Sequence, residues 1–393
     1  MVNIGLPFVK SNQKKPTLII ITNLYPLPWE PNRATFNRQQ FAQLNNSFEK
    51  SMLIPIAFPE WLKHRKQIKQ TQNLRYVPYF YLPKLGRRFY SAMMFFSIML
   101  HSGLWLWRKK PQKILASWAF PEAVAASWIS KLLHCDFYFK VHGSDINLHG
   151  KVSARAKQIV NASKNAKGIL SVSQALADEM ITMGIAAAKI HVIYNGVDHQ
   201  TFQLNNATLN NACDEYVLYV GNLKKEKGVI ELLKGFAAIS AKYPRLKLVY
   251  AGPGNLSAEI LATAKSMALS DKVTLLGSVN HAKLPELIGQ AKILALPSYN
   301  EGVPNVVLEA MACGTPVLVS DVGGIPEVVN ESICGKIITA KCETAVAEGL
   351  DYILTKQWNR KEIQRHSQQF SWQNNEKQLL QMLNMINIQG YKS

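Results

Sequence analysis

Two glutamates, Glu301 and Glu309, lie in a stretch from Pro297 to Pro316 that predicts a ligand site. The apolar run 293–296 before it is short and does not alternate, as in a buried parallel strand. A loop with glycine and proline follows, and then a helix that Gly314 closes. The start of that helix favours a phosphate, whereas carboxylates beside a phosphate site usually bind hydroxyls. The stretch therefore predicts a bound sugar nucleotide.

The composition is that of a folded protein. The chain has 393 residues, of which 48% are hydrophobic and 18% charged, so it is long enough for two domains. Its five cysteines are odd in number and show no Cys-x-x-Cys spacing, which argues against a disulfide framework or structural zinc and favours a reducing compartment. No long apolar run precedes Lys14, so we expect no signal peptide and a cytoplasmic protein.

The positive charge is concentrated in one half of the chain. Residues 1–200 hold 26 Lys and Arg against 9 Asp and Glu, a net charge of +17, whereas residues 201–393 hold 19 against 17. Such a half suits nucleic acid or an anionic membrane surface. Because the sequence shows no basic-aromatic platform or known nucleic-acid motif, we expect the membrane surface and no nucleic acid.

Short apolar runs alternate with helical patterns, which predicts α/β structure with parallel sheets. In the first half we expect strands at 18–22, 51–58, 75–82, 113–117, 137–141, 168–172 and 190–194. In the second half we expect strands at 216–221, 246–251, 273–279, 293–296, 316–320 and 335–338. The polar segment 199–214 marks a domain boundary, and a last helix is expected from Trp372 to Ile388 with Ser371 as its N-cap. The loop after the first strand is a candidate for acceptor contact or a structured connection.

The segment 89–107 contains no Asp, Glu, Lys or Arg and is flanked by basic residues on both sides. Its length would fit a membrane span. However, it includes a histidine, a glycine and three serines, and a span would place the flanking strands on opposite sides of a bilayer. We therefore expect a crossover helix that packs partly on the sheet and partly faces lipid head groups. The alternative is a simply buried crossover helix.

Two further groups have residue types that suit a sugar-nucleotide site. His142 follows the strand 137–141, and with Gly143 and Asp145 it suits contact with a bound sugar, although a lone histidine can also be structural. After the strand 216–221, a run of lysines offers charge to a diphosphate. Within this run we favour Lys227, because Gly228 lets the chain approach closely. The alternative is a solvated face.

These patterns together resemble glycosyltransferase family 4, which comprises retaining sugar-nucleotide transferases of the GT-B fold. The resemblance covers nearly the whole chain. Its most specific element is the Glu-x7-Glu motif in EGVPNVVLEAMACGTPVLVSDVGGIPE, supported by VIYNGVD, VGNLKKEKG, VHGSD and a terminal Phe-Ser-Trp. The VGNL and HGSD segments are similar to those of bacterial enzymes of cell-surface polysaccharide assembly.

The resemblance implies two Rossmann-like, doubly wound domains that face each other across a cleft. Residues 1–200 would form the acceptor-side domain and residues 201–371 the nucleotide-sugar-binding domain. Residues 372–393 would form a helix that returns to pack on the N-terminal domain.

The resemblance also implies roles for individual residues. Glu309 would hold the nucleotide ribose, and Glu301 would meet donor-sugar hydroxyls near the reacting carbon. His142 would face the donor sugar and Lys227 the diphosphate, so we expect Glu301, His142 and Lys227 to be catalytic. With Glu309, the expected donor-binding residues are Gly221, Asn222, Lys224, Lys225, Gly252, Gly302, Val303 and Asn305. Gly302, Val303 and Asn305 would offer backbone N–H groups.

One position departs from the family pattern. The family often has an arginine after the glycine that ends the first strand of the C-terminal domain, and here Asn222 follows Gly221. Either Lys224 or Lys225 supplies the missing charge, or the diphosphate depends more on Lys227 and the helix dipole. The sequence shows no Asp-x-Asp motif in a suitable loop, so we expect no metal and no cofactor.

We therefore expect a retaining hexosyltransferase of polysaccharide biosynthesis. It would move a sugar from a nucleoside diphosphate sugar to a saccharide acceptor, which the basic half and the segment 89–107 suggest is lipid-linked. It would lie peripherally at the inner face of the membrane. Two alternatives are a non-catalytic sugar-nucleotide-binding scaffold at the membrane and a protein that binds or modifies nucleic acid.

Overall fold

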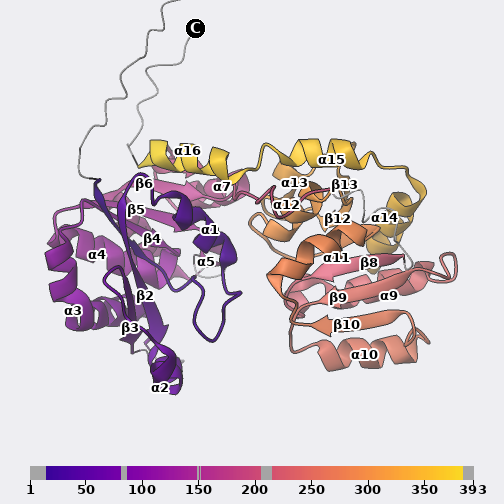
Figure 1. Ribbon diagram of the computed structural model, residues 1–393, viewed down its shortest axis with the longest axis horizontal. Coiled ribbons are helices and arrows are strands. Elements are labelled where there is room, and N and C mark those ends of the chain that lie inside the picture. Colours follow the sequence, from indigo (N-terminus) through magenta and orange to yellow (C-terminus); the bar gives the residue numbers. More distant parts are fainter. Residues whose placement is uncertain (1–14, 81–85, 148–149, 151, 205–214, 384–393) are drawn as a thin grey trace, which may run out of the picture.

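The computed structural model describes residues 15–80, 86–147, 150, 152–204 and 215–383. These residues form two α/β units, each built on its own parallel sheet (Figure 1). Each sheet lies within its own hydrophobic core. We call the unit that contains β1–β7 the first unit and the unit that contains β8–β13 the second unit.

The first sheet has seven strands in the order β3-β2-β1-β4-β5-β6-β7, and all their pairings are parallel. Apolar side chains fill its centre, where Leu18 to Ile21 are fully buried. The strands are β1 Thr17–Ile21, β2 Glu49–Ala57, β3 Leu74–Tyr79, β4 Lys113–Ser117, β5 Asp136–Val141, β6 Ala166–Ser171 and β7 Ile190–Val192.

The second sheet repeats this arrangement with six parallel strands in the order β10-β9-β8-β11-β12-β13. In both sheets the order reverses between the first and fourth strands, and such a switch point opens a crevice at the carboxyl ends of the strands. The strands are β8 Tyr216–Val220, β9 Lys247–Ala251, β10 Val273–Gly277, β11 Ile293–Leu296, β12 Val317–Ser320 and β13 Gly335–Ile338.

Helices connect the strands of each sheet, as parallel pairing requires. Those of the first half are α1 Thr35–Gln43, α2 Phe58–His64, α3 Tyr90–Lys109, α4 Val124–Leu132, α5 Ser144–Asn147, α6 Ser153–Asn165 and α7 Gln174–Thr182. Those of the second half are α9 Val229–Ile239, α10 Ser257–Ser266, α11 Leu284–Gln290, α12 Asn305–Ala312, α13 Ile325–Val328, α14 Glu343–Thr355, α15 Arg360–Ser367 and α16 Trp372–Met382.

The chain passes between the units twice, and the two crossings lie side by side. The N–H of Val197 donates to the carbonyl of Phe370 at 2.8 Å. A Cβ on Gly196 would lie 2.5 Å from the backbone nitrogen of Trp372, so a side chain at Gly196 would push the crossings apart. Beyond this point α16 lies along the first unit (Figure 1), where Leu379 and Leu383 are fully buried in its core.

The predicted α/β architecture is confirmed, with differences at the ends of elements. The strand expected at 190–194 ends at Val192, and the strand expected at 273–279 ends at Gly277, whose φ is +63°. Ser371 caps α16 as predicted by accepting the N–H of Asn374. The far ends of the predicted strand 75–82, the boundary segment 199–214 and the last helix lie outside the described residues.

The helix α3 is neither wholly buried nor wholly exposed. Met94, Ile98 and Leu106 are buried against the sheet, whereas Phe96 and Leu100 are exposed. The alternative of a simply buried crossover helix is therefore wrong. Within the described ranges no helix is long and apolar enough to cross a membrane.

Candidate active site

A cavity of about 390 Å³ lies between the two units, where the carboxyl ends of the two sheets meet. It brings together six of the predicted site residues, from segments that are far apart in the sequence. These are His142 of the first unit and Glu301, Gly302, Val303, Asn305 and Glu309 of the second. The other lining residues are Asn32, Ala34, Thr35, Phe36, Val172, Asn195, His281 and Pro304.

Lys227 reaches the site by pairing with Glu301. The Lys227 Nζ lies 2.6 Å from Glu301 Oε1, and the Glu301 side chain is only 12% exposed. The backbone explains this contact, because Gly228 has φ +67° and any Cβ there would collide with the carbonyl oxygen of Pro297. The N–H of Tyr299 also donates to the carbonyl of Glu226 at 2.9 Å. Gly228, beside Lys227, therefore lets its segment of the chain pack closely against Pro297, and the sequence predicted such a close approach of the chain.

The helix α12 carries Glu309 and ends as predicted. Gly314 has φ +68°, and the N–H groups of Thr315 and Gly314 donate to the carbonyls of Ala310 and Met311. These two bonds satisfy carbonyls at the end of the helix. The ending fixes the length of α12, and with it the position of Glu309 within the helix.

His281, which no sequence motif singled out, lies beside Glu309 in the lining of the cavity. Its Nε2 lies 3.4 Å from Glu309 Oε1. The hydrogen bond to Glu309 raises the pKa of His281, while burial opposes the shift. A single histidine in a short turn carries no motif, so only its position in the fold identifies it as a site residue.

Neighbouring side chains fix the imidazole of His142. Its Nε2 lies 2.8 Å from Ser117 Oγ, and its ring lies near the rings of Phe36 and Trp118 at centroid distances of 5.4 and 6.0 Å. Burial, assisted by the charge of Lys140, lowers the pKa of His142 well below its usual value. His142 is therefore a neutral hydrogen-bonding group at neutral pH.

Asp145 has a different place from the one we expected. It is fully buried, and its carboxylate accepts the backbone N–H groups of His142, Gly143 and Ala119 at 2.9–3.0 Å. These three hydrogen bonds occupy acceptor positions of the Asp145 carboxylate with backbone donors, as in a tight turn. Asp145 therefore shapes the loop that carries His142 and does not line the cavity.

Gly143 also differs from the expectation that it lets the backbone approach a bound sugar, because it lies against the backbone of the second unit. With φ +127°, it would place a Cβ 3.2 Å from the backbone nitrogen of Gly302 in the second unit. In the reverse direction, a Cβ on Gly302 would lie 2.5 Å from the carbonyl oxygen of His142. The two glycines thus allow the loops of the two units to touch backbone to backbone beside the cavity.

A buried lysine that the sequence analysis did not select, Lys140, lies behind the cavity. Its Nζ faces three amide oxygens, those of Gln40 at 2.8 Å, Asn195 at 3.2 Å and Asn37 at 3.3 Å. Asn195 donates in turn to Asn305 Oδ1 at 3.0 Å, at the start of α12. Burial lowers the pKa of Lys140 to about 7, opposed by the charge of Asp145.

The same network continues to the C-terminal helix. The Gln40 Nε2 donates to Asn375 Oδ1 at 2.8 Å, and Asn375 Nδ2 donates to the carbonyl of Tyr194 at 2.7 Å. Buried amides that satisfy one another in this way specify a unique arrangement of the elements that carry them. Lys140, whose ammonium group faces Gln40 and Asn195, therefore links α1 and α16 to α12 of the second unit.

The remaining predicted site residues do not line the cavity. A Cβ on Gly252 would collide with the carbonyl oxygen of Gly221, so these glycines let the ends of β8 and β9 pack closely. Asn222, Lys224 and Lys225 are exposed, and their contact with a donor remains a prediction. Among the described residues, no group of three or more His, Cys, Asp or Glu could hold a metal ion.

A second cavity of about 470 Å³ lies at the carboxyl edge of the first sheet. Asn23, Leu24 and Arg33 line it, and all three belong to the loop after the first strand that we predicted to contact an acceptor. Its other lining residues are mostly aromatic: Tyr79, Tyr90, Trp118, Phe120, Pro121 and Arg155. Because Trp118 also stacks near His142, this cavity adjoins the first one.

Two family models match the chain in succession. Residues 57–201 match the model described as glycosyltransferase family 4, and residues 202–388 match glycosyl transferases group 1. A glycosyltransferase of Methanocaldococcus jannaschii is 30% identical over 222 residues, which are 52% of this chain and 57% of that protein. TuaC of Bacillus subtilis, named as a teichuronic acid biosynthesis glycosyltransferase, is 28% identical over 85% of this chain and 88% of its own length.

Solved structures share the fold at low sequence identity. Anabaena HepE, determined in complex with UDP, has a TM-score of 0.72 and 18% identity over 94% of this chain and all of that chain. Sucrose-phosphate synthase from Thermosynechococcus elongatus has a TM-score of 0.73 and 20% identity over 94% of this chain and 98% of that chain. These similarities identify the two-unit architecture as the GT-B fold.

Proposed function

Because the chain belongs to glycosyltransferase family 4, we propose that it moves a hexosyl group from a nucleoside diphosphate sugar to a saccharide acceptor with retention of anomeric configuration. The observation that carries this proposal is the cavity where His142, Glu301 and Glu309 meet. The donor would lie against α12 and the loop before it. UDP-sugars are the first donors to test, since the HepE structure contains UDP.

In this proposal Glu309 holds ribose hydroxyls, and the start of α12 faces the phosphates with the positive end of its dipole. Glu301 holds hydroxyls of the donor sugar. Lys227, whose Nζ lies 2.6 Å from Glu301 Oε1, holds the diphosphate with its ammonium group. His281 positions Glu309 through their hydrogen bond. Lys224 and Lys225 supply the charge that Asn222 does not.

The reaction would proceed on one face of the sugar. The oxygen of the acceptor hydroxyl bonds to the anomeric carbon as the bond from that carbon to the diphosphate oxygen breaks. The hydroxyl proton passes to the departing phosphate. Charge develops on phosphate oxygens, which Lys227 and backbone N–H groups stabilise without a metal ion or other cofactor. Glu301 orients the sugar and stabilises its positive charge.

The acceptor would enter from the aromatic cavity at the carboxyl edge of the first sheet. Aromatic rings offer flat surfaces to sugar rings, and Arg33 and Arg155 line the same cavity. Two arginines suit an anionic group, such as the phosphate of a lipid-linked saccharide. A lipid-linked acceptor in polysaccharide biosynthesis would place the protein at the cytoplasmic face of a membrane, and the net charge of +17 in residues 1–200 supports this location.

The test is a panel of nucleoside diphosphate sugars incubated with the protein and a membrane extract. Mass spectrometry of released nucleoside diphosphate and of new glycolipid identifies the donor, and NMR of the product gives the anomeric configuration. We expect one preferred donor, an unchanged configuration and activity that survives EDTA. A protein that binds a sugar nucleotide but releases no diphosphate would be a scaffold, and an inverted product would contradict the proposed mechanism.

A further inference from the structure

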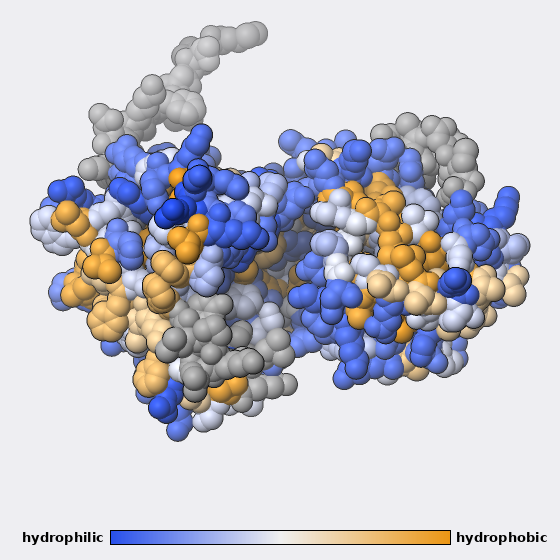
Figure 2. All heavy atoms as spheres, turned by 90° about the horizontal axis from the view of Figure 1, so that it is seen from below, coloured by the Kyte–Doolittle hydropathy of each residue, from blue (hydrophilic) through white to orange (hydrophobic). Residues whose placement is uncertain are grey.

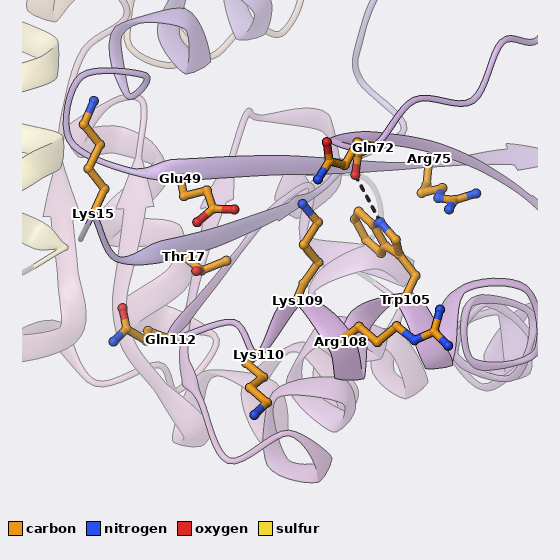
Figure 3. Close-up of a pocket in the computed structure, with 10 residues that line it drawn as sticks. All are labelled: Lys15, Thr17, Glu49, Gln72, Arg75, Trp105, Arg108, Lys109, Lys110 and Gln112. Carbon is orange, nitrogen blue, oxygen red and sulfur yellow. Dashed lines mark hydrogen bonds between the residues drawn. The ribbon is translucent and has the colours of Figure 1, made fainter.

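A third cavity, of about 710 Å³, lies at the opposite edge of the first sheet (Figure 3). Thr17 and Glu49 start β1 and β2, and Gln112 directly precedes β4. His142, in contrast, follows the carboxyl end of β5. A strand of five residues is roughly 17 Å long. This cavity and the candidate active site therefore lie at opposite ends of the strands, and a ligand in this cavity would not contact a donor beside His142. We call it the basic pocket; its other lining residues are Lys15, Gln72, Arg75, Trp105, Arg108, Lys109 and Lys110.

The basic pocket is lined by five cationic side chains and one carboxylate, that of Glu49. Trp105 organises one wall, because Arg75 and Lys109 each lie 5.9 Å from its ring centroid. The Trp105 indole also donates to the carbonyl of Gln72 at 3.2 Å (Figure 3). The Nε of Arg75 is buried and has no hydrogen-bond partner among the described residues. This wall is therefore fixed and positively charged.

An exposed apolar stripe leads to this pocket along α3. Phe96, Leu100, Leu104 and Trp107 follow one another at spacings of three and four residues, so they lie on one face of the helix. They are 68, 83, 61 and 63% exposed. In Figure 2, hydrophobic side chains are visible at the surface of the first unit among hydrophilic ones. The stripe reaches the last turn of α3, where Arg108 and Lys109 line the basic pocket.

The helix α4 extends the apolar surface. The ring of Trp128 contacts that of Phe95 at 5.8 Å between centroids, and Trp128 and Leu132 are 36 and 55% exposed. The sequence around the stripe has one sign of charge, since residues 61–121 contain twelve Lys and Arg and no Asp or Glu. Exposed apolar side chains flanked by cations suit the interface of an anionic bilayer.

We propose that α3 lies in the interface of an anionic membrane and that the basic pocket binds the phosphate of a lipid headgroup. This inference deepens the membrane location in the proposed function, because it identifies the surface and the headgroup chemistry. A lipid accounts for both features at once, the apolar stripe through its chains and the basic pocket through its phosphate. A free phosphate or a nucleic acid would leave the stripe without a role.

The test is co-sedimentation with vesicles of phosphatidylcholine alone and with 30% phosphatidylglycerol, at physiological salt. We expect binding only to the anionic vesicles. The pocket variant Arg108→Gln/Lys110→Gln should bind them roughly thirtyfold more weakly, from about 1 kcal/mol for each cation near the surface. Its matched control is Lys164→Gln/Lys167→Gln, which removes two exposed cations from α6 and β6 and should change binding less than threefold.

The apolar variant Leu100→Gln/Leu104→Gln should weaken vesicle binding at least tenfold, because two side chains no longer enter the interface. Its control is Leu261→Gln on α10, another exposed leucine. All variants should keep the circular dichroism spectrum of the parent. Equal losses in the pocket variant and its control would overturn the headgroup pocket, and unchanged binding of the apolar variant would overturn the placement of α3 in the interface. None of these outcomes depends on transferase activity.

Discussion

The two units share one strand order but organise their functional groups differently. In the second unit, Glu301 and Glu309 belong to one continuous stretch that runs from a strand through a loop into α12. In the first unit the groups behind the cavity come from α1, β5, the crossing segment and α16, so Gln40 and Asn375 are 335 residues apart in sequence. In the proposed function a local motif therefore holds the donor, while a dispersed network fixes the opposing wall.

The largest effect should come from Glu301→Gln, which keeps the shape and removes the charge. We expect turnover to fall roughly 100-fold to 1,000-fold, because the residue is proposed to stabilise charge that develops in the transition state. Steady-state kinetics with the preferred donor measures this loss. Near-normal turnover would show that the second unit does not carry the chemistry.

Lys140→Met should lower turnover roughly tenfold without an equal loss of donor affinity, since Lys140 positions Asn195 and Asn305 and does not line the cavity.

A second readout for Lys140→Met is the free energy of unfolding as a function of pH. The folded pKa of Lys140 is about 7 and its ordinary value is 10.5. Between these values the unfolded chain binds more protons, so the contribution of Lys140 to stability rises with pH.

Urea unfolding of the parent and the Lys140→Met variant at pH 7 and pH 9.5 isolates this contribution. The parent should gain stability relative to the variant at the higher pH. If the difference between the two proteins does not change with pH, Lys140 is not buried in the folded state as described.

Gly143→Ala tests the backbone contact between the units. Both Gly143 and Gly184 have positive φ, at +127° and +96°, but only a Cβ on Gly143 would meet the second unit, whereas nothing lies within 4 Å at Gly184. Backbone strain at such positions costs of order 1–3 kcal/mol. We expect both alanine variants to lose thermal stability and only Gly143→Ala to lose turnover several-fold as well. Equal turnover in the two variants would contradict a functional contact.

The smallest effect should come from Glu327→Gln. The Glu327 carboxylate, on α13, accepts the N–H groups of Gln174 and Ala175 at the start of α7 and the hydroxyl of Tyr194. Loss of such a cap costs about 1 kcal/mol, which calorimetry would detect as a Tm lower by a few degrees. An unchanged Tm would show that this link between the units does not contribute to stability.

The sequence predicted the fold and the second-unit motif because both depend on local rules. Buried parallel strands are short apolar runs, and Gly228 and Gly314 occupy positions with positive φ that favour glycine. Lys140, Asn195 and His281 could not be found in this way, since their partners lie on other elements. Asp145 was misread for a related reason, because sequence alone did not show that backbone N–H groups satisfy its carboxylate.

The most direct test of the comparison is the affinity for UDP, or for whichever nucleoside diphosphate the donor panel selects, measured by titration calorimetry on two variants. Glu309→Gln should weaken binding roughly 10-fold to 100-fold, as for a lost hydrogen bond to a charged group. His142→Ala, on the opposing wall, should leave affinity within about twofold while turnover falls. If His142→Ala weakens binding as much as Glu309→Gln does, the donor does not rest on the second unit alone, and the assigned division between the units is wrong.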